Sequence, residues 1–161
     1  MTRKELSSII WIWCLSTLFA VFVTIGVMNS REEEREEELN EWVTLQMAII
    51  LTESQFDSTA FNPSGAKGLY QLMPVYVKEV NNILDRTKDK REKFKPEDAY
   101  DIDKSIEMFN ILQDYFNPEK DIDKAISYHN KGRSYKKKVY KNMEHIRNVE
   151  EIRRKILKSQ E

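Results

Sequence analysis

The feature that most constrains this chain is an uncharged stretch near its amino terminus. From Leu6 to Ser30 there is no Asp, Glu, Lys or Arg over 25 residues. A helix needs about 20 predominantly apolar residues to cross the roughly 30 Å hydrocarbon layer of a bilayer. A helix in a globular core rarely stays apolar around its whole circumference. The stretch therefore predicts one transmembrane helix over residues 6–30.

The charges on either side of this stretch predict its orientation. Arg3 and Lys4 precede it, whereas Arg31–Glu41 follows it with two Arg and seven Glu. By the positive-inside bias, residues 1–5 form a short cytoplasmic tail and everything after Ser30 lies outside the cytoplasmic membrane. A cleaved signal peptide is the alternative, but its apolar core is usually only 7–15 residues long. We therefore predict an uncleaved, single-pass signal anchor with a periplasmic or extracellular domain.

Helical periodicity organises the rest of the chain. We predict a charged helical stalk (31–40), one domain (41–140) and a basic C-terminal helix (141–161). Apolar residues recur at i, i+3 and i+4, and no segment alternates with a period of two. The fold class is therefore all-α. The predicted helices cover residues 39–51, 71–84 and 99–116, a segment from Asp121 as N-cap to Gly132, and residues 139–156.

Composition excludes several classes of function. The 26 Lys and Arg are balanced by 27 Asp and Glu, which argues against a nucleic-acid partner. A single cysteine excludes an internal disulfide and a multi-cysteine zinc site. His129 and His145 have no obvious partner ligands, and the chain lacks a phosphate-binding glycine loop and an HExxH motif. We expect neither a metal nor another cofactor.

Glu53 is the first candidate for chemistry. It follows the apolar run Ala48–Leu51 and precedes a turn-rich stretch. A partly desolvated carboxyl group can act as a proton donor near neutral pH. A single glutamate near a helix end is more often a solvated or capping residue, so Glu53 alone specifies no activity.

The surroundings of Glu53 carry a family resemblance. Glu53-Ser54-Gln55-Phe56 is followed by a block over residues 62–74 with the sequence Asn-Pro-Ser-Gly-Ala-Lys-Gly-Leu-Tyr-Gln-Leu-Met-Pro, and residues 125–132 have the sequence Ala-Ile-Ser-Tyr-His-Asn-Lys-Gly. These blocks closely resemble the lytic transglycosylase (SLT-type) domain of the lysozyme-like superfamily. That family has a Glu-Ser pair closing a helix, then Gly-Ala-x-Gly-Leu-Met-Gln-Leu-Met-Pro and Ala-Tyr-Asn-x-Gly. The resemblance covers about residues 41–140 and implies a lysozyme-like helical domain with a substrate cleft.

The resemblance also implies a reaction. Glu53 takes the position of the family's single catalytic acid/base, and the cleft holds a peptidoglycan glycan strand. Glu53 would protonate the oxygen between N-acetylmuramic acid and N-acetylglucosamine and then deprotonate the muramic acid 6-hydroxyl. The product would be a 1,6-anhydromuramyl end, with no water consumed.

Other residues receive substrate-binding roles by the same resemblance. They are Ser54 near the reacting sugar, Gly68 in a tight turn, Tyr70 in place of a methionine, Gln71, Tyr128, His129 and Asn130. His129 stands where the family has the tyrosine that orients the glutamate, with Tyr128 one residue earlier. Phe109 replaces a usual glycine.

Two alternatives remain open at this point. A hydrolytic muramidase needs a second carboxylate about 5 Å or 6.5–9.5 Å from the acid, and Asp57, Asp101 and Asp103 are candidates. A catalytically inactive wall-binding or assembly protein is the other. A lysis, secretion or other envelope-spanning assembly and general wall turnover are all compatible with the sequence. The C-terminal helix is either a solvated face or a basic surface attracted to anionic wall polymers or membrane.

Overall fold

The computed structural model describes residues 31–32, 35–37 and 40–158. The predicted transmembrane helix over residues 6–30 lies outside these residues. Within the described part, no helix combines the length and apolar character that a membrane crossing requires. The chain divides into two compact units, Met1–Glu41 and Trp42–Glu161. Residues 31–32, 35–37 and 40–41 of the first unit are helical, and the site described below lies in the second.

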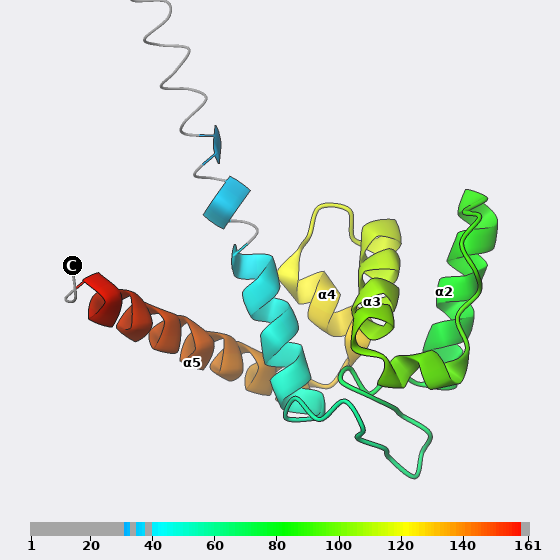
Figure 1. Cartoon of the computed structure of the whole chain (residues 1–161), viewed down its shortest axis with the longest axis horizontal. Coiled ribbons are helices and arrows are strands. Elements are labelled where there is room, and N and C mark those ends of the chain that lie inside the picture. Colours follow the sequence, from blue (N-terminus) through cyan, green and yellow to red (C-terminus); the bar gives the residue numbers. More distant parts are fainter. Residues whose placement is uncertain (1–30, 33–34, 38–39, 159–161) are drawn as a thin grey trace, which may run out of the picture. The chain divides into compact units, whose positions relative to one another are not determined.

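The second unit is built from helices (Figure 1). The helix over residues 40–53 contributes residues 42–53 to this unit and leads into turns. The labelled elements follow in the order α2 (Pro74–Thr87), the 3₁₀ helix η1 (Pro96–Tyr100), α3 (Ile102–Phe116), α4 (Ile122–His129) and α5 (Arg133–Lys158). Over the described residues only isolated bridges join Lys67 to Phe61 and to Leu72, and no strand forms. The predicted all-α fold is therefore confirmed for this part of the chain.

Capping residues set the helix starts. Asp101 begins α3 by accepting the backbone N–H of Lys104 at 3.0 Å. Asp121 begins α4 by accepting that of Lys124 at 2.7 Å, as the sequence predicted. Each carboxylate satisfies one of the N–H groups that a helix leaves unpaired in its first turn.

Several helix boundaries differ from the prediction. Helix α2 begins at Pro74 instead of Gln71, because proline suits the first helical position and Gln71 has a left-handed φ of 49°. The predicted 99–116 helix is divided at Asp101, whose backbone is extended. Helix α4 ends at His129, before Gly132, and α5 begins directly after that glycine, at Arg133 instead of residue 139.

Helix α5 is attached to the end of the 40–53 helix. Val139 and Met143 are fully buried in the core. Lys138 Nζ donates to the backbone oxygen of Thr52 at 3.2 Å, and Asn142 Nδ2 donates to Thr52 Oγ1 at 2.9 Å. These contacts fix the backbone immediately before Glu53.

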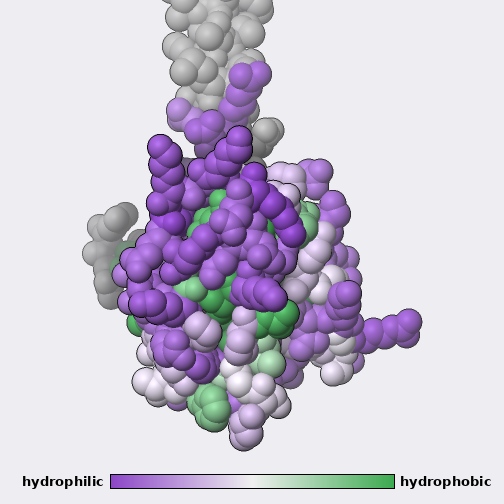
Figure 2. Space-filling view, turned by 90° about the vertical axis from the view of Figure 1, so that its right-hand side faces the viewer, coloured by the Kyte–Doolittle hydropathy of each residue, from purple (hydrophilic) through white to green (hydrophobic). Residues whose placement is uncertain are grey.

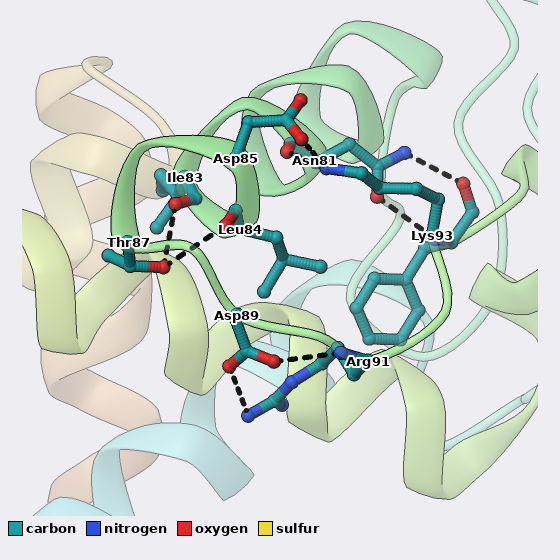
Figure 3. Close-up of polar contacts among 9 residues, drawn as sticks. Asn81, Ile83, Leu84, Asp85, Thr87, Asp89, Arg91 and Lys93 are labelled. Carbon is teal, nitrogen blue, oxygen red and sulfur yellow. Dashed lines mark hydrogen bonds and ion pairs between the residues drawn. The ribbon is translucent and has the colours of Figure 1, made fainter.

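The loop between α2 and η1 is held by a side chain of α2. Asn81 Nδ2 donates to the backbone oxygen of Phe94 at 2.8 Å, and the N–H of Phe94 donates back to Asn81 Oδ1 at 2.9 Å. Asp89 pairs with Arg91 at 2.9 Å within the loop (Figure 3). The loop is exposed apart from the buried ring of Phe94, so Asn81 fixes a segment that has little core of its own.

Candidate active site

Glu53 and His129 meet at the ends of two helices. Glu53 is the last residue of the 40–53 helix, and His129 is the last residue of α4. His129 Nε2 lies 3.2 Å from Glu53 Oε1. The His129 side chain is 6% exposed and the Glu53 side chain is 20% exposed, so the carboxyl is the more open of the two to solvent.

A cavity of about 530 Å³ opens at this pair, within the size range of small-ligand sites. Side chains of α2, α3 and α4 and of the loop before α2 form its walls. On the side of the domain that carries α2, hydrophobic residues show among hydrophilic ones (Figure 2). The lining residues are Glu53, Asn62, Ala66, Gln71, Leu72, Met73, Val75, Tyr76, Glu79, Leu112, Tyr128, His129 and Asn130.

The imidazole of His129 is enclosed by aromatic rings. Its centroid lies 6.0 Å from that of Tyr135, and 6.3–6.4 Å from those of Tyr70, Tyr76 and Phe109. Nδ1 is buried and has no hydrogen-bond partner among the described residues. A buried N–H without an acceptor is rarer than an unpaired acceptor. The surroundings therefore favour the tautomer with its proton on Nε2, which donates to Glu53 Oε1.

Two tyrosines that the sequence analysis did not single out border this pair. Tyr76 lines the cavity from α2, and Tyr135 comes from the first turn of α5. The Tyr76 hydroxyl is buried without a hydrogen-bond partner in the described part of the chain, and the buried Tyr135 hydroxyl lies beside the Glu53 carboxyl. Burial raises the pKa of both groups, and the nearby Glu53 carboxyl raises that of Tyr135 further. Both hydroxyls therefore stay protonated at neutral pH and can donate.

Four other predicted residues are placed around the cavity with Glu53. Gln71 donates from Nε2 to the backbone oxygens of Gly68 (3.0 Å) and Ala60 (3.1 Å), which fixes its amide group in the wall. Tyr128 and His129 line the cavity from α4. Asn130 follows α4, where its Oδ1 accepts the N–H of Gly132 at 2.9 Å.

Three other predicted residues do not line the cavity. Tyr70 is fully buried, and its hydroxyl donates to Gln46 Oε1 at 2.7 Å. Ser54 Oγ donates to the backbone oxygen of Ile50 at 3.2 Å. Gly68 has φ of 70°, and a β-carbon there would collide with the backbone oxygen of Ala99. Their direct contact with substrate stays a prediction.

Two departures from the family pattern compensate each other. Tyr70 replaces a methionine, and Phe109 replaces a glycine. Their rings stack with centroids 4.7 Å apart and planes 13° apart. Phe109, which is larger than the glycine it replaces, therefore fills core volume against Tyr70 and next to His129 and does not block the cavity.

The second carboxylate at the cavity is Glu79, which the sequence analysis did not consider. Asp57 binds Thr59 instead, accepting its N–H at 2.8 Å, and Asp101 caps α3. Neither of them, nor Asp103, lines the cavity. Glu79 accepts hydrogen bonds from Asn82 and Arg86, each at 2.9 Å, and these bonds lower its pKa. Helical spacing could not single out Glu79, because nothing in the sequence fixes which face of α2 lines the cavity.

Comparison with known proteins supplies one match. A family model described as "Transglycosylase SLT domain" matches residues 30–150, most of the chain. No curated protein and no solved structure matches this chain. Across the described residues, no group of three or more His, Cys, Asp or Glu could hold a metal ion.

Proposed function

The chain belongs to the transglycosylase SLT domain family, and on that premise we propose that it is a lytic transglycosylase with Glu53 as its single acid/base. The activity of the family is peptidoglycan cleavage of the lytic transglycosylase type. The observation that best supports this role for Glu53 is its carboxyl group in the cavity wall, 3.2 Å from a buried imidazole.

The contact with His129 gives the two carboxyl oxygens of Glu53 different roles. With the Nε2 proton donated to Oε1, the other oxygen is left to carry a proton into the cavity. It would give that proton to the glycosidic oxygen as the bond to the muramic acid anomeric carbon breaks. The muramic acid 6-hydroxyl then attacks this carbon and gives its proton to Glu53. One carboxyl group is sufficient, because the substrate supplies the nucleophile and Glu53 ends protonated, as it began.

A hydrolytic muramidase is the second candidate, and Glu79 is the observation that favours it. Its carboxylate lines the same cavity, and its lowered pKa keeps it ionised at neutral pH. An ionised carboxylate can activate water as a general base in an inverting hydrolase or attack directly in a retaining one. Its two hydrogen bonds to Asn82 and Arg86 favour a supporting role, because both carboxylate oxygens already accept.

Product analysis distinguishes the two reactions. Purified peptidoglycan is digested with the full chain in detergent and with Glu53→Gln, Glu79→Gln and Asp57→Asn variants, and the ends are identified by mass spectrometry. We expect 1,6-anhydromuramyl ends, lighter by one water than hydrolysed ends. Glu53→Gln should lower their yield by about 10²–10⁴-fold, the usual contribution of a general acid. Asp57→Asn is the matched control and should cleave normally.

Each other outcome has its own meaning. Reducing ends that disappear in Glu79→Gln would identify a muramidase. Wild-type cleavage by Glu53→Gln would refute the assignment of the acid. Strand binding without products from any variant would identify a binding module.

We further propose that the domain is tethered outside the cytoplasmic membrane. The support is the uncharged stretch Leu6–Ser30 with Arg3 and Lys4 before it. Protease added to spheroplasts should digest a carboxyl-terminal tag, while the chain stays with the membrane after alkaline washing. A tag that is protected until the cells are lysed would contradict this topology.

A further inference from the structure

An aromatic strip leads out of the cavity along the surface, formed by Tyr128, Phe116 and Tyr115. We propose that this aromatic strip is an additional binding site for pyranose rings of a glycan strand. The domain would then act preferentially on strands long enough to reach Tyr115. This inference rests on the proposed function, since it extends the same substrate beyond the bond that is cleaved.

The three rings form a continuous series. Tyr128 lines the cavity and is 45% exposed. Its ring centroid lies 5.7 Å from that of Phe116, which packs partly against the core. Phe116 in turn meets Tyr115 edge to face at 4.9 Å, and Tyr115 is 41% exposed. The partly buried middle ring therefore holds two exposed rings in place, one at the cavity and one beyond it.

Polar side chains of α2 connect the same two places. Glu79 lines the cavity and binds Arg86 at 2.9 Å. Glu79 is the main cause of the raised pKa of Arg86, and Tyr115 contributes to it, so the guanidinium lies beside the Tyr115 hydroxyl. Arg86 is half exposed and has five N–H donors, more than Glu79 occupies. Between the cavity and Tyr115, the rings of α3 and α4 thus supply aromatic contacts, and Arg86 of α2 supplies hydrogen-bond donors.

This combination suits a carbohydrate. A pyranose ring presents C–H groups on its faces and hydroxyl and amide groups around its edge. The C–H groups are attracted to the negative face of an aromatic ring, while the edge groups need hydrogen-bond partners. Two exposed rings, those of Tyr128 and Tyr115, with charged pairs around them do not form the broad apolar patch that a protein interface or a dimer requires. Continuity with the cavity makes the glycan strand itself the occupant.

The test uses Tyr115, which lies outside the cavity. The full chain and its Tyr115→Ala and Tyr115→Phe variants are assayed on polymeric glycan strands and on a tetrasaccharide of two disaccharide repeats. Tyr115→Ala should raise KM on polymeric strands by about 3–10-fold, the size of an aromatic contact, and leave the tetrasaccharide unaffected. Tyr115→Phe keeps the ring and should behave as wild type. Tyr100→Ala removes an exposed tyrosine elsewhere and is the matched control.

A binding assay separates this inference from the function on which it rests. In the Glu53→Gln background, co-sedimentation with insoluble glycan strands is compared with and without Tyr115→Ala. Weaker binding of the double variant supports the aromatic strip even if the reaction differs from the one proposed. Equal binding, or an equal loss of activity on both substrates, would overturn the inference alone. No binding by any variant, together with no products from the wild-type chain, would instead refute the proposed function.

Discussion

At the scale of single residues, His129 shows how a departure from a family pattern can keep a functional contact. The family has a tyrosine at this position, and the structure places the imidazole Nε2 3.2 Å from Glu53. The ring is held by four aromatic neighbours, and its buried Nδ1 favours the tautomer that donates to the carboxylate. His129 is thus a positioning residue for Glu53 in the proposed reaction.

Replacement of His129 tests this role. His129→Phe keeps the aromatic packing and removes the donor, so kcat should fall by about 10–100-fold, the value of a hydrogen bond to a charged group. His129→Gln keeps an N–H donor and should retain more activity. Nitrogen NMR of the wild-type chain should find the proton on Nε2 of His129. Unchanged kcat in His129→Phe, or a proton on Nδ1, would contradict the role.

Gly68 carries a prediction about stability. Its left-handed φ and the close backbone of Ala99 leave no room for a β-carbon. Gly68→Ala should lower the free energy of unfolding by about 1–3 kcal/mol from backbone strain, and by more from the collision, as measured by denaturant titration. Gly132→Ala is the control, because Gly132 has no positive φ and a β-carbon there would come no closer than 3.2 Å to any neighbouring atom, the Asn130 Oδ1. Equal stability of the two variants would show that the 65–73 turn can shift away from η1.

At the scale of elements, one side chain of α2 holds the 88–95 loop. Asn81 makes two hydrogen bonds to the backbone of Phe94, and the loop has few other buried contacts. Asn81→Ala should therefore release the loop while α2 persists. We expect faster hydrogen exchange at the N–H of Phe94, by at least about tenfold for the loss of one such bond. Lys90→Ala, an exposed change in the same loop, should leave this exchange rate unaltered.

Helix α5 divides into a packed half and an exposed half. Val139 and Met143 are fully buried, whereas Val149 and Ile152 are 49% and 58% exposed. Met143→Ala should cost about 2–5 kcal/mol, the usual range for a large-to-small core change. Truncation after Arg147 should lower the free energy of unfolding by less than about 1 kcal/mol, because residues 148–157 are exposed and bury little apolar area. Thermal unfolding of both variants checks these values. A larger loss of stability in the truncated chain than in Met143→Ala would show that the exposed half of α5 packs against another surface in solution.

At the scale of the whole domain, paired carboxylates should set its resistance to acid. Burial raises the pKa of Asp98, but the hydrogen bonds from Lys104 Nζ and the N–H of Lys95 and the charges of these lysines together outweigh it, so the pKa is lowered. A lowered pKa in the folded state means that the stability is present above pH 3.8 and is lost as the pH falls through the folded-state pKa. The pKa values of other carboxyls are lowered too, and these are Asp57, Glu79, Asp89, Glu97, Asp123 and Glu151.

The corresponding measurement is unfolding free energy against pH between about 6 and 2. The wild-type chain should lose stability steadily below about pH 4. Asp98→Asn should be less stable than wild type at pH 6 and should show a flatter curve below pH 4. Glu144→Gln, on the exposed surface of α5, should follow the wild-type curve. A wild-type curve without an acid limb would mean that these pairs do not persist in solution.

Much of the architecture could be predicted from local sequence. Apolar spacing at i, i+3 and i+4 predicted the helices, and Asp121 was predicted as the N-cap that the structure contains. These features depend on contacts between residues a few positions apart, so the sequence by itself determines them. The Glu53 and Gly65–Pro74 blocks likewise predicted the family that the chain matches.

The composition of the candidate site was decided only by tertiary structure. Successive residues on a helix point about 100° apart, so Tyr128 and His129 of α4 face different neighbours. Packing of α4 against the 40–53 helix brings His129 to the carboxyl and leaves Tyr128 at the start of the aromatic strip. Packing of α2 against α3 places Glu79 at the cavity, whereas Asp57 does not line it. Sequence periodicity specifies that a helix has a buried face, but which side chains converge depends on how several helices turn toward one another.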